Sequence, residues 1–146
     1  MQQAGYKSYA FEELEVGMEA SYTRTLAAAD IITFADVSGD MNPLHLDAAY
    51  AATTIFKSPI AHGMHTAGYI STVFGTIMPG PGAIYVSQTL NFRGPVRAGD
   101  TVIATVKVLE LFPAKSRARF ECVCTVNGKS VLEGEAILMV PSAKKA

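Results

Sequence analysis

The segment from His62 to Met78 most constrains the fold, because it is the one long helix that the sequence predicts. It is apolar nearly all round, a pattern typical of a helix that is buried on most sides. Pro79-Gly80-Pro81-Gly82 ends it, since this tetrapeptide cannot continue a helix. Its glycines lower its helical propensity, so packing must hold it in place. The rest of the chain is therefore expected to fold around this helix.

The residues after this helix alternate between apolar and polar side chains, as strands of an antiparallel sheet do. Before the helix, 20–25 predicts a short strand, and 27–38 and 47–52 predict two helices. The Asn127-Gly128 pair predicts a two-residue hairpin turn. An antiparallel sheet needs its apolar face covered, so we expect one α+β domain over residues 1–146, with a core of about 11–141. The alternating segments are 84–92, 101–108, 117–126 and 132–140.

The composition excludes several classes of function. The 146 residues carry a formal net charge of -1, which argues against nucleic acid and acidic membrane surfaces as partners. No apolar run reaches the ~18 residues that a spanning helix needs, and the first residues do not resemble a signal peptide. We therefore expect a cytoplasmic location. Cys122 and Cys124 are expected to be buried thiols rather than a disulfide or a metal site.

The run Asp40-Met41-Asn42-Pro43-Leu44-His45 places a carboxylate and an imidazole on either side of an Asn-Pro turn. That turn can fold both side chains toward one point, on a loop outside the core. Downstream, His62-Gly63 opens the long helix, whose first backbone N–H groups are fixed hydrogen-bond donors. A carboxylate, an imidazole and a helix start suit acid/base chemistry on a substrate that develops an oxyanion.

These motifs resemble the MaoC-like hot-dog hydratases, specifically the (R)-specific enoyl-CoA hydratases. The similarity extends from about Phe11 to Pro141 and implies a hot-dog fold, in which an antiparallel sheet wraps one central helix behind a helical overhang. It also implies a homodimer or a higher homo-oligomer joined edge to edge. The matching pieces are Asp40–Asp47, Ala51–Thr54, Pro59–Met64 and Ile84–Gln88.

The resemblance implies the reversible hydration of trans-2-enoyl-CoA to (R)-3-hydroxyacyl-CoA. A carboxylate and a neutral imidazole can hold one water between them, so we expect Asp40 to act as the base and His45 as its partner. The resemblance implies the same two roles, and it assigns the oxyanion role to the backbone N–H of Gly63. It also assigns an assisting role to Ser71, although a serine on a buried helix often bonds a carbonyl one turn back.

Several residues have plainer interpretations. Asp40 and Asn42 are common turn formers, Asp47 is a helix N-cap, and His62 can orient its loop by a hydrogen bond. His65 is expected to be a core residue with a satisfied side chain.

His62 and His65 could bind a metal with Asp40 or His45, but no further signature supports a metal. We therefore expect no metal and no cofactor except coenzyme A as part of the substrate. The candidate contacts for its phosphates are Lys57, Arg93 and Arg97, none of them preferred.

Three other functions remain open at this point. A dehydratase subunit acting on acyl-carrier-protein substrates would need a basic docking patch, which the net charge of -1 does not indicate. A hot-dog acyl-CoA thioesterase would use its carboxylate at the carbonyl carbon. A non-catalytic acyl-CoA-binding domain would not need an intact Asp40 and His45. The sequence leaves the acyl chain length open.

Overall fold

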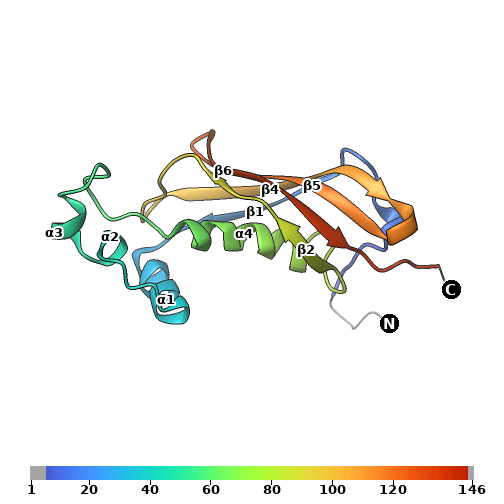
Figure 1. Cartoon of the computed structure of the whole chain (residues 1–146), viewed down its shortest axis with the longest axis horizontal. Helices are drawn as coiled ribbons and strands as arrows, with labels where there is room; N and C mark the ends of the chain where they lie inside the picture. The colour runs from blue at the N-terminus through green and yellow to red at the C-terminus, as the bar shows by residue number, and fades with distance from the viewer. Residues whose placement is uncertain (1–5, 145–146) are drawn as a thin grey trace.

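The computed structural model describes residues 6–144 and contains one antiparallel sheet with a long helix along one face (Figure 1). The sheet has six strands in the order β1-β4-β5-β6-β2, with the short β3 also pairing with β6. Strands β2 and β3 therefore lie at the edge of the sheet opposite β1. The bounds are β1 Glu19–Thr25, β2 Ile84–Gln88, β3 Asn91–Phe92, β4 Thr101–Phe112, β5 Arg117–Val126 and β6 Lys129–Met139.

The helices are divided between the sheet and an overhang beyond it. Helix α4 packs along the sheet, whereas α1, α2 and α3 lie beyond the end of the sheet near which α4 begins (Figure 1). This arrangement confirms the α+β hot-dog fold that the sequence predicts. No helix within residues 6–144 is long and apolar enough to cross a membrane. The bounds are α1 Ala28–Ser38, α2 Pro43–Leu46, α3 Ala48–Ala51 and α4 Gly63–Thr76, with short 3₁₀ turns at Phe11–Glu13 and Pro113–Lys115.

The core lies between one face of α4 and the inward-facing side chains of β4, β5 and β6. Phe74 of α4 meets Phe120 of β5 edge to face, with ring centroids 4.9 Å apart. Cys122 and Cys124 are fully buried in this layer, and burial raises the pKa of each thiol to about 12. They therefore pack as small apolar side chains, as the sequence predicts.

The prediction that the central helix is buried on most sides is wrong for the chain by itself. Tyr69, Ile70, Val73 and Phe74 face the sheet, but the opposite stripe of α4 is exposed. A Cβ atom added to Gly68 or Gly75 would meet no atom within 4 Å. A single sheet covers only one face of a helix, so the small residues of the other face stay open. The exposed stripe is formed by Met64, Gly68, Ser71 and Gly75.

The predicted strand 84–92 is interrupted between β2 and β3. The backbone carbonyl of Glu135 in β6 accepts a hydrogen bond from the backbone N–H of Thr89 at 2.8 Å. The Thr89 hydroxyl in turn accepts a hydrogen bond from the backbone N–H of Glu135 at 2.9 Å. A Cβ on Gly134 would collide with the Thr89 carbonyl, so this close approach requires glycine. Strand β4 in turn continues to Phe112, four residues beyond the predicted end at Val108, past a register shift between Val108 and Glu110.

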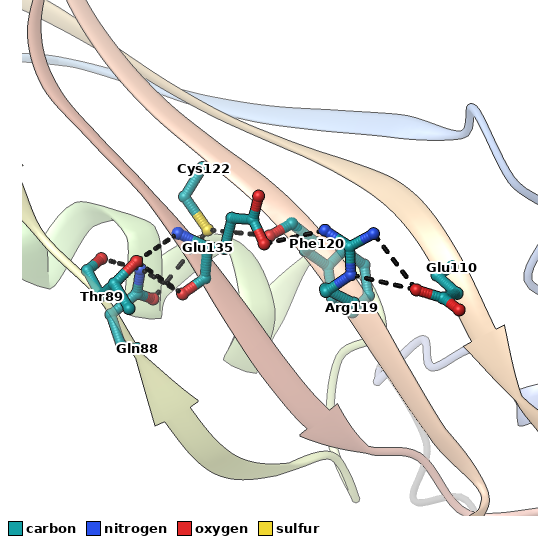
Figure 2. A network of polar contacts seen from close by, with 7 residues as sticks. All are labelled: Gln88, Thr89, Glu110, Arg119, Phe120, Cys122 and Glu135. Carbon is teal, nitrogen blue, oxygen red and sulfur yellow. Dashed lines mark hydrogen bonds and ion pairs between the residues drawn. The ribbon is translucent and has the colours of Figure 1, made fainter.

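Part of the polar network drawn in Figure 2 lies on the face of the sheet away from α4. Arg119 of β5 donates to Glu135 of β6 at 2.8 Å and to Glu110 of β4 at 3.2 Å. The guanidinium therefore bridges three neighbouring strands. Because these groups are partly exposed to solvent, which screens their charges, each ion pair contributes little to stability.

Candidate active site

Asp40 is held in a defined turn directly after α1. Gly39 ends that helix with a φ of 80°, a left-handed conformation that favours glycine. The backbone N–H of Asp40 donates to the Ser38 hydroxyl at 3.1 Å, and its own carboxylate accepts the backbone N–H of Asn42 at 3.1 Å. Asn42 then caps α2 by accepting the N–H of Leu44 at 3.0 Å, which confirms its structural role. The turn leaves the Asp40 carboxylate exposed.

His45 lies on the short helix α2, and the expectation that it lies on a loop is wrong. A helix of four residues is too short to produce a periodic sequence pattern, but Pro43 at its first position suits it. The Nδ1 atom of His45 lies 2.7 Å from the carbonyl oxygen of Ile60. Because a carbonyl oxygen only accepts, Nδ1 carries the proton and Nε2 keeps the lone pair in the neutral ring.

The overhang and the start of α4 bring Asp40, His45 and His62 together. Oxygen or nitrogen atoms of the three side chains all lie within 4.8 Å of one another. A water molecule with two hydrogen bonds of about 2.8 Å spans a gap of this size. The separation of these side-chain atoms is therefore within the span of one bridging water.

His62 contacts both other members of this cluster: the hydrogen bond that the sequence predicts for it is confirmed, whereas its stacking on His45 was not predicted. Its Nε2–H donates to the backbone carbonyl of Asp40 at 2.9 Å, and its ring stacks on His45 with centroids 3.8 Å apart. Phe34 of α1 packs on His62 at 4.8 Å and on His65 at 5.0 Å between ring centroids, so it covers the start of α4. The sequence carried only a weak signal for this, the placement of His62 just before the helix.

The stacking argues against a metal bound by His45 and His62 together. A metal ion lies in the plane of each imidazole that binds it, and these two rings are nearly parallel, at 27°. One ion therefore cannot lie in both planes at bonding distance. His65 lies outside the cluster, with its Nε2 3.3 Å from the Tyr69 hydroxyl.

Gly63 is the first residue of α4, and its N–H has no acceptor within the helix. The ring of Phe92 lies directly over it, because a Cβ atom on Gly63 would be 2.6 Å from a Phe92 ring carbon. The Phe92 ring can occupy this place because residue 63 has no side chain.

A cavity of about 580 Å³ lies beside His45 and Gly63, within the size range of small-molecule sites. Its lining is mostly apolar and comes from α4, the edge of the sheet and the loop before β4. The lining includes His45, Gly63, Met64, Thr66, Phe92 and Val96.

Two of the three candidate cations near this cavity are already engaged. Arg93 lines it but forms an ion pair with Glu133 at 2.9 Å, which lowers the pKa of that carboxyl group. Arg97 donates to the Phe56 carbonyl at 2.7 Å and to the Ser58 hydroxyl at 2.9 Å, so it braces the loop between α3 and α4. Lys57 is exposed and forms no ion pair with any residue from 6 to 144.

Ser71 is not gathered with Asp40 and His45. It faces a separate groove of about 400 Å³ between α4 and β2, and Met64 borders both this groove and the cavity. Thr72 and Thr76 bond carbonyls one turn back, whereas no such bond of Ser71 is found within the described chain. An assisting role for Ser71 stays a prediction.

The chain is similar to known hydratases and dehydratases over nearly its whole length. It is 54% identical to the (R)-specific enoyl-CoA hydratase of Rhodospirillum rubrum, covering 90% of this chain and 92% of the relative. It is 51% identical to the 3-hydroxybutyryl-CoA dehydratase of Methylorubrum extorquens, covering 93% and 87%. Among solved structures, the unliganded R-hydratase of Pseudomonas aeruginosa matches with a TM-score of 0.88 and 46% identity, over 97% of this chain and 94% of that one.

The profile of one protein family matches residues 11–133, most of the chain, and is described as a MaoC-like domain. This match confirms the family that the motifs around Asp40 and Gly63 indicate. These two relatives exceed 50% identity over nine-tenths or more of the chain, so the similarity is one of sequence as well as of fold. The protein is therefore a member of the MaoC-like family of hot-dog proteins.

Proposed function

We propose that this protein is an (R)-specific enoyl-CoA hydratase that adds water to trans-2-enoyl-CoA and also catalyses the reverse dehydration. The observation that carries the proposal is the convergence of Asp40 and His45, because His45 lines an apolar cavity together with Gly63. The family and the two relatives above 50% identity support it, since both are named for this chemistry on CoA thioesters.

The geometry suggests how the reaction proceeds. One water donates one hydrogen bond to the Asp40 carboxylate and another to Nε2 of His45, which is unprotonated because Nδ1 donates to the Ile60 carbonyl. Asp40 takes a proton as the water oxygen bonds to C3 and the double-bond electrons move toward the thioester carbonyl. The resulting enolate oxygen accepts a hydrogen bond from the Gly63 N–H, at the positive end of the α4 helix dipole. The proton then returns to C2 from the same face, which gives syn addition and restores both side chains.

We propose that the acyl group of the substrate is carried by coenzyme A rather than by an acyl carrier protein. The two relatives above 50% identity are both named for CoA thioesters. Of the two arginines near the cavity, Arg93 is paired with Glu133 and Arg97 braces a loop, so neither is free for a carrier's acidic surface. The exposed Lys57 is the candidate contact for a CoA phosphate.

A homodimer joined through β2 is part of the proposal. This edge strand exposes Ile84, Tyr85 and Val86 at 57%, 41% and 41%, next to the open stripe of α4. An exposed apolar edge strand favours pairing with another chain. No metal or separate cofactor is included, and a cytoplasmic location, which cell fractionation would test, is retained.

The direct test supplies crotonyl-CoA and longer trans-2-enoyl-CoA substrates to C12 and follows the loss of enoyl-thioester absorbance. Chiral analysis should find the (R)-3-hydroxyacyl product. Release of free CoA without hydration would indicate a thioesterase, and activity only on carrier-protein thioesters would indicate the dehydratase subunit. Binding without turnover would indicate the non-catalytic domain.

A further inference from the structure

We infer that His62 is a positioning residue for the proposed hydration and acts through both Asp40 and His45. The inference rests on the proposed function but concerns a residue outside the reacting groups. His62 is 2% exposed, so it is not expected to touch substrate.

The first contact fixes Asp40. The carbonyl oxygen of Asp40 only accepts, so the His62 Nε2, 2.9 Å away, must donate to it. This bond ties the turn after α1 to the start of α4, 22 residues later in the chain. Within residues 6–144, the Asp40 side chain makes one hydrogen bond, which it accepts from the N–H of Asn42 in the same turn. Without His62, that turn would lose its bond to α4.

The second contact fixes the plane of His45. The single hydrogen bond from Nδ1 to Ile60 still leaves the ring some rotation about its Cβ–Cγ bond. The face of His62, 3.8 Å away, restricts this rotation, and Phe34 supports His62 in turn. The plane of His45 determines where its Nε2 lone pair points. His62 therefore positions the base and its partner together, and it immediately precedes Gly63, the oxyanion donor.

Two substitutions separate these contacts. His62→Gln keeps an N–H donor but removes the ring, and His62→Phe keeps a flat ring but removes the donor. Each should lower kcat for crotonyl-CoA by roughly 10- to 100-fold, because small displacements of catalytic groups have effects of this size. KM should stay within about threefold, since the buried His62 is not expected to touch substrate. The pH profile of kcat/KM, which reports the essential acid and base, should also shift.

His65 supplies the matched control. It lies one turn further along α4 and stacks on the same Phe34, but it contacts neither Asp40 nor His45. His65→Gln and His65→Phe should lower the melting temperature while kcat and the pH profile of the folded enzyme stay near wild type. Equal kinetic effects at positions 62 and 65 would reduce His62 to a packing residue and overturn the inference.

Other outcomes are equally decisive. Folded His62 variants with wild-type kcat, or with raised KM at unchanged kcat, would contradict a positioning role. If neither variant folds, Phe34→Leu loosens the support of the His62 ring and should produce the same fall in kcat at unchanged KM. Wild-type kinetics in that variant would overturn the inference. A wild-type protein that does not hydrate enoyl-CoA would instead overturn the proposed function, before any variant is compared.

Discussion

The ring of Phe92 lies against the backbone of Gly63, so close that a Cβ atom at Gly63 would be 2.6 Å from a ring carbon. Gly63→Ala should therefore push the ring into the cavity that both residues line. Since Phe92 is 54% exposed, its ring can move and the protein should still fold. We expect kcat/KM to fall at least about 10-fold with a nearly unchanged melting temperature.

Removing the ring should relieve this clash. The double variant Gly63→Ala/Phe92→Ala should be more active than Gly63→Ala, while Phe92→Ala alone reports the contribution of the ring. A cycle of the four proteins measures the coupling between the two positions. A double variant no more active than Gly63→Ala would show that the contact does not govern access to the Gly63 N–H.

The β2 edge should hold the proposed dimer together. Val86→Asp places a charge on this edge and should shift the protein to monomers, because burying an unpaired charge is costly. The control is Thr23→Asp on β1, the edge at the other end of the sheet, which should stay dimeric. Sedimentation velocity at micromolar concentration measures both. A folded wild-type monomer, or dissociation caused only by the β1 substitution, would contradict the proposed interface.

Local signals account for much of what the sequence predicts correctly. Gly39 ends α1 with a positive φ, and Asn127 and Gly128 both have positive φ in the turn between β5 and β6. The break between β2 and β3 has no local signal, since it depends on the approach of Gly134 from a distant strand. The open face of α4 likewise depends on how far the sheet extends around it.

In the site, too, the contacts between residues close in sequence were predictable and those between distant elements were not. Asp40 and His45 are close in sequence and joined by an Asn-Pro turn, so their convergence follows from the motif. The burial of His62 depends instead on Phe34, a residue 28 positions earlier on a different helix. Periodicity does not report such contacts, and the sequence interpretation of His62 was accordingly limited to orienting a loop.

His65 should make stability depend on pH. Burial lowers its pKa below the usual 6.5, so between the two values the unfolded chain binds more protons than the folded one. The stabilisation is present above about pH 6.5 and is lost as the pH falls. Thermal melts at pH 8 and pH 5.5 should differ less in His65→Phe than in the wild type. An equal difference would mean that His65 does not contribute to this pH dependence.

Chelation should leave the activity intact, because the proposed mechanism activates water with side chains and the stacked His45 and His62 rings oppose a shared ion. Prolonged dialysis against EDTA, followed by assay and metal analysis, tests this. A stoichiometric metal whose removal abolishes activity and whose return restores it would transfer the role of Asp40 from base to metal ligand.

The central claim is that Asp40 and His45 act as one unit on a shared water, and a double-mutant cycle on kcat tests it most directly. Asp40→Asn keeps the shape of the side chain but removes the base, and His45→Gln removes the imidazole. Each single change should lower kcat by roughly 10²- to 10⁴-fold with little effect on melting. The double variant should lose little more than the worse single variant, because groups that act together are not additive. A near-normal rate for Asp40→Asn, or losses that multiply in the double variant, would contradict the account.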